Sequence, residues 1–416
     1  MQNSKQATTT LLLVSLLSLG CVLKFATVKK KFEDHLKPID FDDSIAVESQ
    51  KSTVSNSQEV PTNSDLEKRT INTTTVFDNY RSLLPDIHFP PVNYSDLQRA
   101  VICASITSEE KYVEEWLDYH LALGFSDIYI SDNSPNHTLH PFNGTRANRV
   151  HVFKTSNQKS TILGQNLTGD PSWQFAQNTD CLEYLKFKQS NPPRWVAFFD
   201  VDEFLVFYNY TSVVEFLQDY VPDGAIQINW RHFGTSHHSK FLDFPVTLRF
   251  QHRVSVTNPG TKMIASLNDL KGMKVHTGNI FQWKKAGMGS RVFGGGGVWS
   301  SCCSSNTTED LPVALYHYST KSLEEIKKRY WCQEGTGACV KLKGRPVFEG
   351  RLFDKTAWET MTRMLPKYKL LEVPYQQALK SIYSNQTKNY QEAHDAMMQD
   401  WYTSNRQKKY AQWFNK

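Results

Sequence analysis

The chain has 416 residues, of which 39% are hydrophobic and 12% aromatic, a composition typical of a globular protein with a sizeable core. This length suits one large domain, or two smaller ones with appendages. The net charge is only +5 and the Lys and Arg residues are scattered along the chain, which argues against a nucleic-acid partner.

The first 31 residues have the pattern of a targeting segment. Residues 8–23 carry no charge and are rich in Leu, Lys24 interrupts them, and residues 25–28 are free of charge again. The stretch is short for a membrane-spanning helix, which needs about 20 apolar residues. Residues 1–31 are predicted to be a cytoplasmic tail and signal-anchor, with Lys24 snorkelling to the membrane surface, or a cleaved signal peptide that leaves a secreted protein.

Two features bear on the compartment and oppose each other. Residues 29–31 are all Lys, and the positive-inside rule then argues against a lumenal body. Against this, eight Asn-x-Ser/Thr sequons are spread along the chain, which favours a glycoprotein of the secretory pathway. The sequons lie at Asn72, Asn93, Asn136, Asn143, Asn166, Asn209, Asn306 and Asn385.

The cysteines favour the lumen as well. Cys21 lies in the apolar stretch, and the other six form an even set, which is typical of disulfide bonds in an oxidising compartment. Buried free thiols are the alternative, and the spacing leaves the pairing open. We therefore expect a Golgi type II membrane protein with a lumenal body. The six are Cys103, Cys181, Cys302, Cys303, Cys332 and Cys339.

Composition divides the rest of the chain into three parts. Residues 32–98 are polar and hold five prolines without sustained periodicity, which predicts a disordered stem. Residues 99–330 are expected to form the catalytic domain. Residues 331–416 are expected to form a mostly helical C-terminal extension.

Strand and helix patterns alternate through the predicted domain. Strands are predicted at 100–106, 128–130, 150–153 and 195–199, with helices at 109–123 and 172–188. This order predicts an α/β fold with a mostly parallel sheet flanked by helices. Further on we expect a helix at 213–218, a strand at 225–230, β-rich residues 245–275, a mobile glycine-rich loop at 287–297, and a helix at 322–329 with Ser322 and Glu325 as a capping box.

An acidic tetrad at residues 200–203 follows the predicted strand 195–199. Carboxylates at the carboxyl end of such a strand project where an open α/β sheet binds its ligands. Hard oxygen ligands, few in number, suit a divalent cation that also binds a nucleotide diphosphate. Asp200 and Asp202 therefore favour a metal-dependent sugar-nucleotide transferase, whereas a plain surface turn is the alternative.

Polar residues also follow two other predicted strands. Ser105, Thr107 and Glu109 come at the end of the first, and Asp132 and Asn133 at the end of the second. In a parallel sheet these ends share one edge, so together with the tetrad they could bind a nucleotide sugar. An Asx-turn before Pro135 is the alternative for Asp132.

Five segments together resemble glycosyltransferase family 92 and its family 2-like relatives, over roughly residues 99–329. The resemblance implies a GT-A (Rossmann-like) fold, a nucleotide-sugar donor that is often UDP-galactose, a glycan acceptor, Mn²⁺ or Mg²⁺, and inversion at the anomeric carbon. The segments are 115–125 (EWLDYHLALGF), 128–134 (IYISDNS), 200–204 (DVDEF), 230–237 (WRHFGTSH) and 317–322 (HYSTKS).

The resemblance assigns Asp200 and Asp202 to the metal motif. We expect Asp202 to coordinate directly and Asp200 to face the ribose or a metal-bound water. His317 is the expected third ligand, with His276 as its competitor, and Lys321 beside it could pair with phosphate. A histidine packed in an aromatic strand is the alternative for His317.

The acceptor side is expected at Trp230, Arg231 and His237, with His276 as a further candidate there. A strand and turn with a core Trp230 is the alternative. Lys262 is expected to be a surface lysine, with a phosphate contact as the other possibility.

An inverting transfer needs a general base, for which Glu203, Asp243 and Asp269 are open candidates. The glycine-rich loop could act as a lid. Two other functions compete with a glycosyltransferase: a metal-dependent nucleotide-sugar hydrolase, and an inactive glycan-binding relative.

Overall fold

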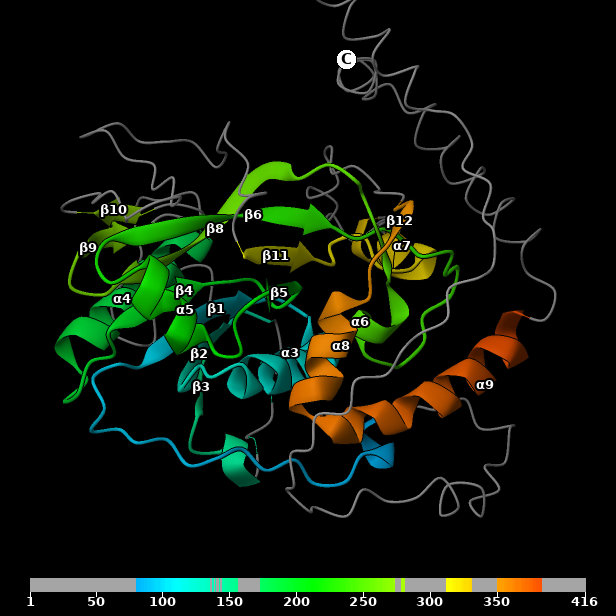
Figure 1. The fold of residues 1–416 in the computed structure, drawn as a ribbon, viewed down its shortest axis with the longest axis horizontal. Coiled ribbons are helices and arrows are strands. Elements are labelled where there is room, and N and C mark those ends of the chain that lie inside the picture. The colour runs from blue at the N-terminus through cyan, green and yellow to red at the C-terminus, as the bar shows by residue number, and fades with distance from the viewer. Residues whose placement is uncertain are drawn as a thin grey trace, which may run out of the picture. The chain divides into compact units, whose positions relative to one another are not determined.

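A computed structural model describes residues 80–134, 137, 139, 142, 144–155, 173–273, 278–280, 312–330 and 350–383. Within these residues the central feature is an eight-stranded sheet with the order β3-β2-β1-β4-β8-β6-β11-β5 (Figure 1). Its strands are β1 (Ala100–Ile106), β2 (Asp127–Asp132), β3 (Val150–Lys154), β4 (Trp195–Phe198), β5 (Glu203–Phe207), β6 (Ala225–His232), β8 (Asn258–Ser266) and β11 (Val313–His317).

The other elements surround or follow this sheet. Two small sheets pair β9 (Leu270–Met273) with β10 (Gly278–Ile280), and β7 (His252–Arg253) with β12 (Leu352–Phe353). The helices are α3 (Glu110–Ala122), α4 (Trp173–Phe187), α5 (Val213–Tyr220), α6 (Val246–Arg249), α7 (Leu323–Tyr330), α8 (Thr356–Met364) and α9 (Glu372–Tyr383), with short 3₁₀ helices η1 (Tyr80–Leu83), η2 (Gly144–Arg146) and η4 (Pro366–Leu371).

Most strands of the large sheet run in one direction. Strands β3, β2, β1 and β4 are parallel neighbours, and β6 is parallel to β11. Strand β8 is antiparallel to both β4 and β6, and β5 is antiparallel to β11. Six of the eight strands therefore point the same way, and the predicted α/β fold with a mostly parallel sheet flanked by helices is confirmed.

Helices cover both faces of the large sheet. Successive residues of a strand therefore point into two different hydrophobic cores, one on each face. Ile102 and Ala104 of β1 belong to a large core that includes Trp116 of α3. Val101 and Cys103 point to the other face, into a smaller core that includes residues of α4. A strand buried on both faces has a continuous apolar sequence, as residues 100–104 do.

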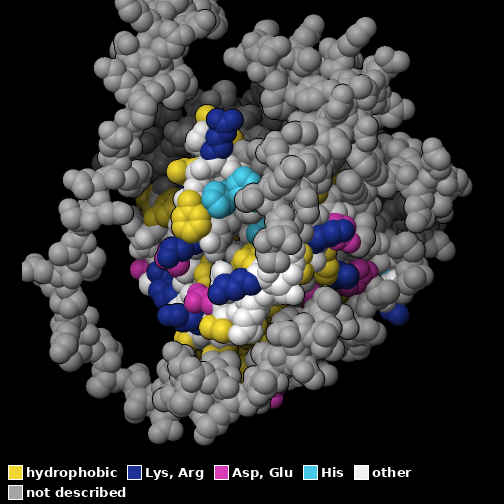
Figure 2. Space-filling model, turned by 90° about the vertical axis from the view of Figure 1, so that its right-hand side faces the viewer, with side chains coloured by type: hydrophobic (Ala, Val, Ile, Leu, Met, Phe, Trp, Pro, Cys, Tyr) yellow, Lys and Arg dark blue, Asp and Glu magenta, His cyan; other side chains and the backbone are white. Residues whose placement is uncertain are grey.

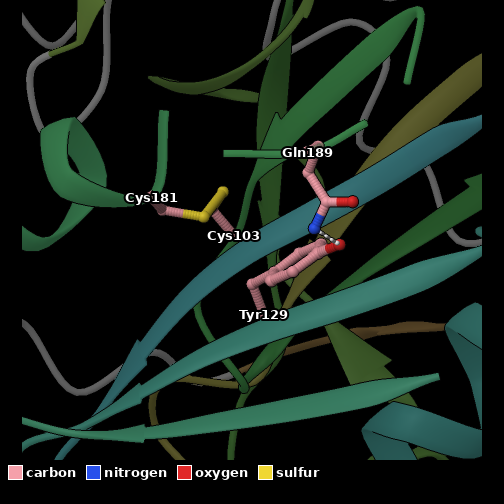
Figure 3. The surroundings of a disulfide bond; sticks show 4 residues. All are labelled: Cys103, Tyr129, Cys181 and Gln189. Carbon is pink, nitrogen blue, oxygen red and sulfur yellow. Dashed lines mark hydrogen bonds between the residues drawn. A yellow bond between two sulfur atoms is a disulfide. The ribbon is translucent and has the colours of Figure 1, made fainter. Parts of the chain in front are cut away.

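A disulfide bond fastens α4 to the sheet. Cys103 of β1 is bonded to Cys181 of α4, with 6.3 Å between their Cα atoms (Figure 3). Beside it, Gln189 donates a hydrogen bond to the Tyr129 hydroxyl at 3.1 Å. One of the expected disulfides is thus present, and the other four predicted partners lie outside the described residues.

Replacing Cys181 by serine is expected to lower the free energy of unfolding by about 2 to 4 kcal/mol, because the bond closes a long loop in the unfolded chain. The two cysteines are separated by 78 residues. Urea titration of the wild type and the variant measures the loss. Cys103→Ser should give a similar loss, since either change removes the same bond, and a loss in only one of the two variants would contradict this account.

The folded body begins earlier than the sequence predicts. The stem was expected to reach residue 98, but Tyr80 and Phe89 are 3% and 5% exposed and belong to the large core. Arg81 forms ion pairs with Glu114 and Asp118 of α3. Residues 80–98 look polar in sequence because their few apolar side chains are isolated, and only their non-local partners show that these side chains are buried.

Several local predictions hold as well. Glu325 and Ser322 form the capping box of α7, in which the Glu325 amide donates to the Ser322 hydroxyl and the Ser322 amide donates to the Glu325 carboxylate. The two described sequon asparagines, Asn93 and Asn209, are exposed. Within the part of the chain that the structure describes, no helix is long and apolar enough to cross a membrane. The N-terminal apolar segment and the glycine-rich loop 287–297 lie outside that part.

Candidate functional site

The acidic tetrad lies where the sheet curls. Only residues 199–202 separate β4 from β5, although three strands lie between them in the sheet order. The tetrad is a turn in which the Glu203 amide donates to the carbonyl of Asp200. Because β6 and β11 run parallel to β4, the carboxyl ends of all three strands lie at this edge. The chain is thereby folded so that residues far apart in sequence meet around the tetrad.

Asp202 and His317 form the centre of this site. The His317 Nε2 atom is 3.3 Å from the Asp202 carboxylate, and both residues are buried. The arrangement is fixed by the backbone, since the Tyr318 amide donates to the Asp202 carbonyl and His317 pairs with Glu203 between β11 and β5. The Lys321 ammonium is 3.8 Å from the second Asp202 oxygen. The resemblance placed these residues in one site, and the structure places them together.

Asp200 is held by a different cation. The Lys262 ammonium is 2.8 Å from one Asp200 oxygen, and the Gln174 amide donates to the other at 2.6 Å. Burial raises the pKa of Asp200, but the charge and hydrogen bond of Lys262, together with His317, outweigh burial and hold this pKa below its ordinary value. Lys262 itself is 1% exposed, so the expectation of a surface lysine is wrong. It is a lysine within the buried strand β8, paired with the acids that surround it.

Glu203 lies beneath the other two acids. It is fully buried, and one of its oxygens accepts a hydrogen bond from the Asp200 amide at 2.9 Å. Burial raises the pKa of Glu203 well above its usual range, and the Lys262 ammonium 3.8 Å away only partly opposes this. The Glu203 carboxylate therefore stabilises the tetrad turn through the Asp200 amide and is not exposed to a substrate.

Three rings line one face of the sheet beside the acids. The His317 ring is 4.8 Å from both the Trp230 and His232 rings. Gly260 of β8 makes room for Trp230, because a Cβ atom there would lie 2.1 Å from the indole ring. Arg231 points to the opposite face, where its guanidinium lies over the Tyr208 ring. The structure therefore separates Arg231 from its neighbour Trp230.

The remaining acceptor-side candidates fall in two places. His237 is exposed on the loop that follows β6, five residues beyond the site residue His232. His276 lies outside the described residues.

The predicted donor-side residues lie at the ends of β1 and β2, which are adjacent in the sheet. The hydroxyls of Ser105 and Thr107 are buried and have no hydrogen-bond partner among the described residues. Asn133 follows β2, and its backbone amide donates to the Ile106 carbonyl. Glu109 directly precedes α3.

Asp132 has the local structural role that the sequence offered as its alternative, an Asx-turn after β2. Its carboxylate accepts hydrogen bonds from the Ser134 amide at 2.9 Å and, more weakly, from the Leu139 amide at 3.5 Å. With 1% exposure it stabilises the loop after β2, as the Asx-turn interpretation expected.

The other two base candidates, Asp269 and Asp243, lie in separate loops. Asp269 follows the end of β8, where Ser266 pairs with Trp195 at the start of β4, so Asp269 lies at the edge away from the tetrad. There it accepts a hydrogen bond from the Gly224 amide. Asp243 is half-buried in the loop before α6, two residues after Phe241, whose backbone amide donates to the Glu324 carboxylate at the start of α7. This loop is on the same side as Lys321.

Two of the three expected metal ligands fit a divalent cation. Asp202 and His317 present a carboxylate oxygen and an imidazole nitrogen to one another, and the other nitrogen of His317 is buried without a hydrogen-bond partner among the described residues. In the described ranges no three His, Cys, Asp or Glu side chains gather closely enough to hold an ion by themselves. Asp202 and His317 therefore fit a cation whose remaining ligands come from a bound phosphate. Asp200 does not complete the set, because its carboxylate is paired with Lys262.

Comparisons with known proteins bear on this site. Residues 98–287 match the family model described as glycosyltransferase family 92, which confirms the resemblance over these residues and supports a glycosyltransferase. A comparison with curated proteins gave no match.

Two solved structures are distantly similar. An active-site mutant of LgtC is 8% identical, with 40% of this chain and 57% of that chain covered and a TM-score of 0.20. Glucosyl-3-phosphoglycerate synthase from Mycobacterium tuberculosis, in complex with phosphoglyceric acid, is 15% identical, with 44% and 64% covered and a TM-score of 0.22. This chain spans less than two thirds of either protein, and likenesses of this size carry no argument.

Proposed function

We propose that this chain, a glycosyltransferase by its match to family 92, is a GT-A enzyme that moves a hexose from a UDP-sugar to a glycan acceptor with inversion. Galactose is the favoured sugar and Mn²⁺ or Mg²⁺ the favoured ion, as the family resemblance implies. The observation that supports this best is the contact between Asp202 and His317, 3.3 Å apart at the carboxyl edge of the sheet. The expected compartment is the Golgi lumen, with a type II membrane anchor.

The residues divide into a metal side and a nucleotide side. Asp202 and His317 would hold the ion, which when bound neutralises negative charge on the departing diphosphate. Lys321, 3.8 Å from Asp202, adds an ammonium group on the same side that can pair with a phosphate oxygen. The hydroxyls of Ser105 and Thr107, which have no hydrogen-bond partner within the described part of the chain, are the proposed contacts to the nucleotide.

Asp200 is proposed to orient the ribose side of the donor. Lys262 and Gln174 fix one oxygen each of its carboxylate, and the side chain is still 30% exposed. A carboxylate that is held rigidly and is partly exposed can accept hydrogen bonds from hydroxyls without reorganising.

Asp243 is the general-base candidate that we propose to test. Glu203 is fully buried and Asp269 lies at the far edge of the sheet, whereas Asp243 is partly exposed near α7. A base must come within hydrogen-bond reach of the acceptor hydroxyl.

The proposed function is tested by measuring the melting temperature of the purified protein with a panel of nucleotide sugars, with and without Mn²⁺. A ligand well above its Kd stabilises the folded state by mass action, so a true donor should raise the melting temperature only when Mn²⁺ is present. Donors that stabilise the protein are then assayed for transfer and for diphosphate release. Release without transfer to any glycan would instead favour a nucleotide-sugar hydrolase, and no shift with any donor would contradict the proposal.

A further inference from the structure

The loop that follows β6 contains two consecutive strained residues. Ser236 and His237 have φ angles of 47° and 61°, in the left-handed region that non-glycine residues rarely adopt. The Ser236 hydroxyl accepts hydrogen bonds from the backbone amides of Gln251 and His252, at 2.9 and 3.0 Å. Such a conformation persists only where the surroundings enforce it, and it is concentrated at functional sites. Here the strain holds the His237 side chain beside His252.

These two histidines begin a row of three rings, which we call the ring platform. The His237 and His252 rings are 5.8 Å apart and the His252 and Phe353 rings are 5.5 Å apart, and both pairs meet edge to face, with 66° and 62° between the ring planes. His252 and Phe353 are direct partners between β7 and β12, so their side chains share a face. Close approach of the two segments requires Gly350, since a Cβ atom there would lie 2.0 Å from the His252 carbonyl oxygen.

The ring platform is rigid on one side and exposed on the other. Phe353 keeps 55% of its surface exposed, although it is held in a strand pair, and His237 is exposed as well. Burial and the neighbouring His237 lower the pKa of His252, so its ring is neutral near neutral pH and keeps an acceptor nitrogen. On the face drawn in Figure 2, histidine and hydrophobic side chains lie together with Lys and Arg around them.

The platform adjoins the candidate site through the backbone. The Val254 amide donates to the carbonyl of His232, and the Gly234 amide donates to the carbonyl of His252, both at 2.9 Å. His232 is the residue whose ring contacts His317. The strand pair that carries the platform is therefore fastened to the end of β6, where the site residues lie.

We propose that the ring platform of His237, His252 and Phe353 binds a sugar ring of the acceptor glycan. This inference rests on the proposed function. A pyranose has apolar faces of C–H groups that pack on rigid rings, and hydroxyls that can bond to imidazole nitrogens. Aromatic side chains provide such contact area with little loss of conformational entropy, and a few polar groups then fix the orientation of the ligand.

The test compares Phe353→Ala and His237→Ala with a matched control, Phe187→Ala. Phe187 is 75% exposed at the end of α4, and its loop leads into the start of β4, at the opposite edge of the sheet. The acceptors are methyl β-galactoside, methyl β-N-acetylglucosaminide and methyl α-fucoside. Phe353→Ala should raise the KM for the best of these glycosides about tenfold, without a comparable rise in the KM for the nucleotide sugar. Phe353→Trp should restore the wild-type value because it keeps a ring.

Saturation-transfer NMR with the same glycosides measures sugar binding independently of catalysis. The signal should fall in Phe353→Ala and His237→Ala but not in Phe187→Ala. Equal signals in all four proteins, or an unchanged acceptor KM in both platform variants, would overturn the proposal. If the wild type turns over no nucleotide sugar but the signal still depends on Phe353, the proposed function fails and the glycan site remains.

Discussion

Replacing Asp202 by asparagine is expected to abolish the Mn²⁺-dependent stabilisation by a nucleotide sugar and to lower the transfer rate about 10²- to 10³-fold. The change keeps the shape of the side chain and the carbonyl that accepts from the Tyr318 amide. It removes the charge that faces both His317 and Lys321, at 3.3 and 3.8 Å. Asparagine would therefore preserve the fold but weaken the pair proposed to hold the ion. The melting-temperature shift and the initial rate of transfer measure the two effects.

The control for this variant is Asp219→Asn. Asp219 is an exposed carboxylate near the end of α5, which leads into the start of β6 at the edge away from the tetrad. Its replacement removes the same charge from the protein and should change neither the shift nor the rate. A normal Mn²⁺-dependent shift in Asp202→Asn would refute the coordinating role, even if the transfer rate were reduced.

Replacing Asp118 by asparagine is expected to lower the free energy of unfolding by about 3 to 5 kcal/mol, because it leaves two largely buried arginines with only the half-exposed Glu114 as a charged partner. Asp118 of α3 is fully buried. Its carboxylate accepts hydrogen bonds from Arg81, Arg146 and the Tyr368 hydroxyl, each at 2.6 Å. These residues belong to η1, η2 and η4, so one carboxylate connects both ends of the described body to α3. Urea titration at neutral pH measures the loss.

A second variant separates the charge from the packing. Tyr368→Phe removes one hydrogen bond to Asp118 and leaves both arginine pairs, so it should cost clearly less, about 1.5 to 3 kcal/mol. Adding Arg146→Met to Asp118→Asn should recover part of the loss, because it removes one of the two arginines that have lost the Asp118 charge. If Asp118→Asn proved no more harmful than Tyr368→Phe, the charge network would not be the source of the stability.

Local sequence patterns were informative where burial alone decides the structure. The continuous apolar run at 100–106 predicted β1, since both faces of that strand are covered. The helical spacing of Trp116 and His120 predicted α3, and Ser322 with Glu325 predicted the start of α7. The position of Asp202 at the carboxyl end of a parallel strand also followed from the order of strands and helices.

The sequence was least informative about strand neighbours. The sequence pattern of residues 203–207 does not indicate which strand they pair with, and in the structure β5 pairs with β11 and not with β4. The same is true of Lys262, whose burial depends on the insertion of β8 between β4 and β6, next to Asp200. Arg231 was grouped with Trp230 because they are adjacent in sequence, but adjacent strand residues face opposite sides of a sheet.

The amino-acid sequence by itself determined the α/β fold with acids at the carboxyl edge of its sheet and the resemblance to glycosyltransferase family 92, because hydrophobic period and motif order are properties of short segments. Tertiary structure alone decided which cation meets which acid, that residues 80–98 join the core, and that Phe353 lies beside His252. The period of a strand reports whether its faces are buried, but not which distant strand provides the cover.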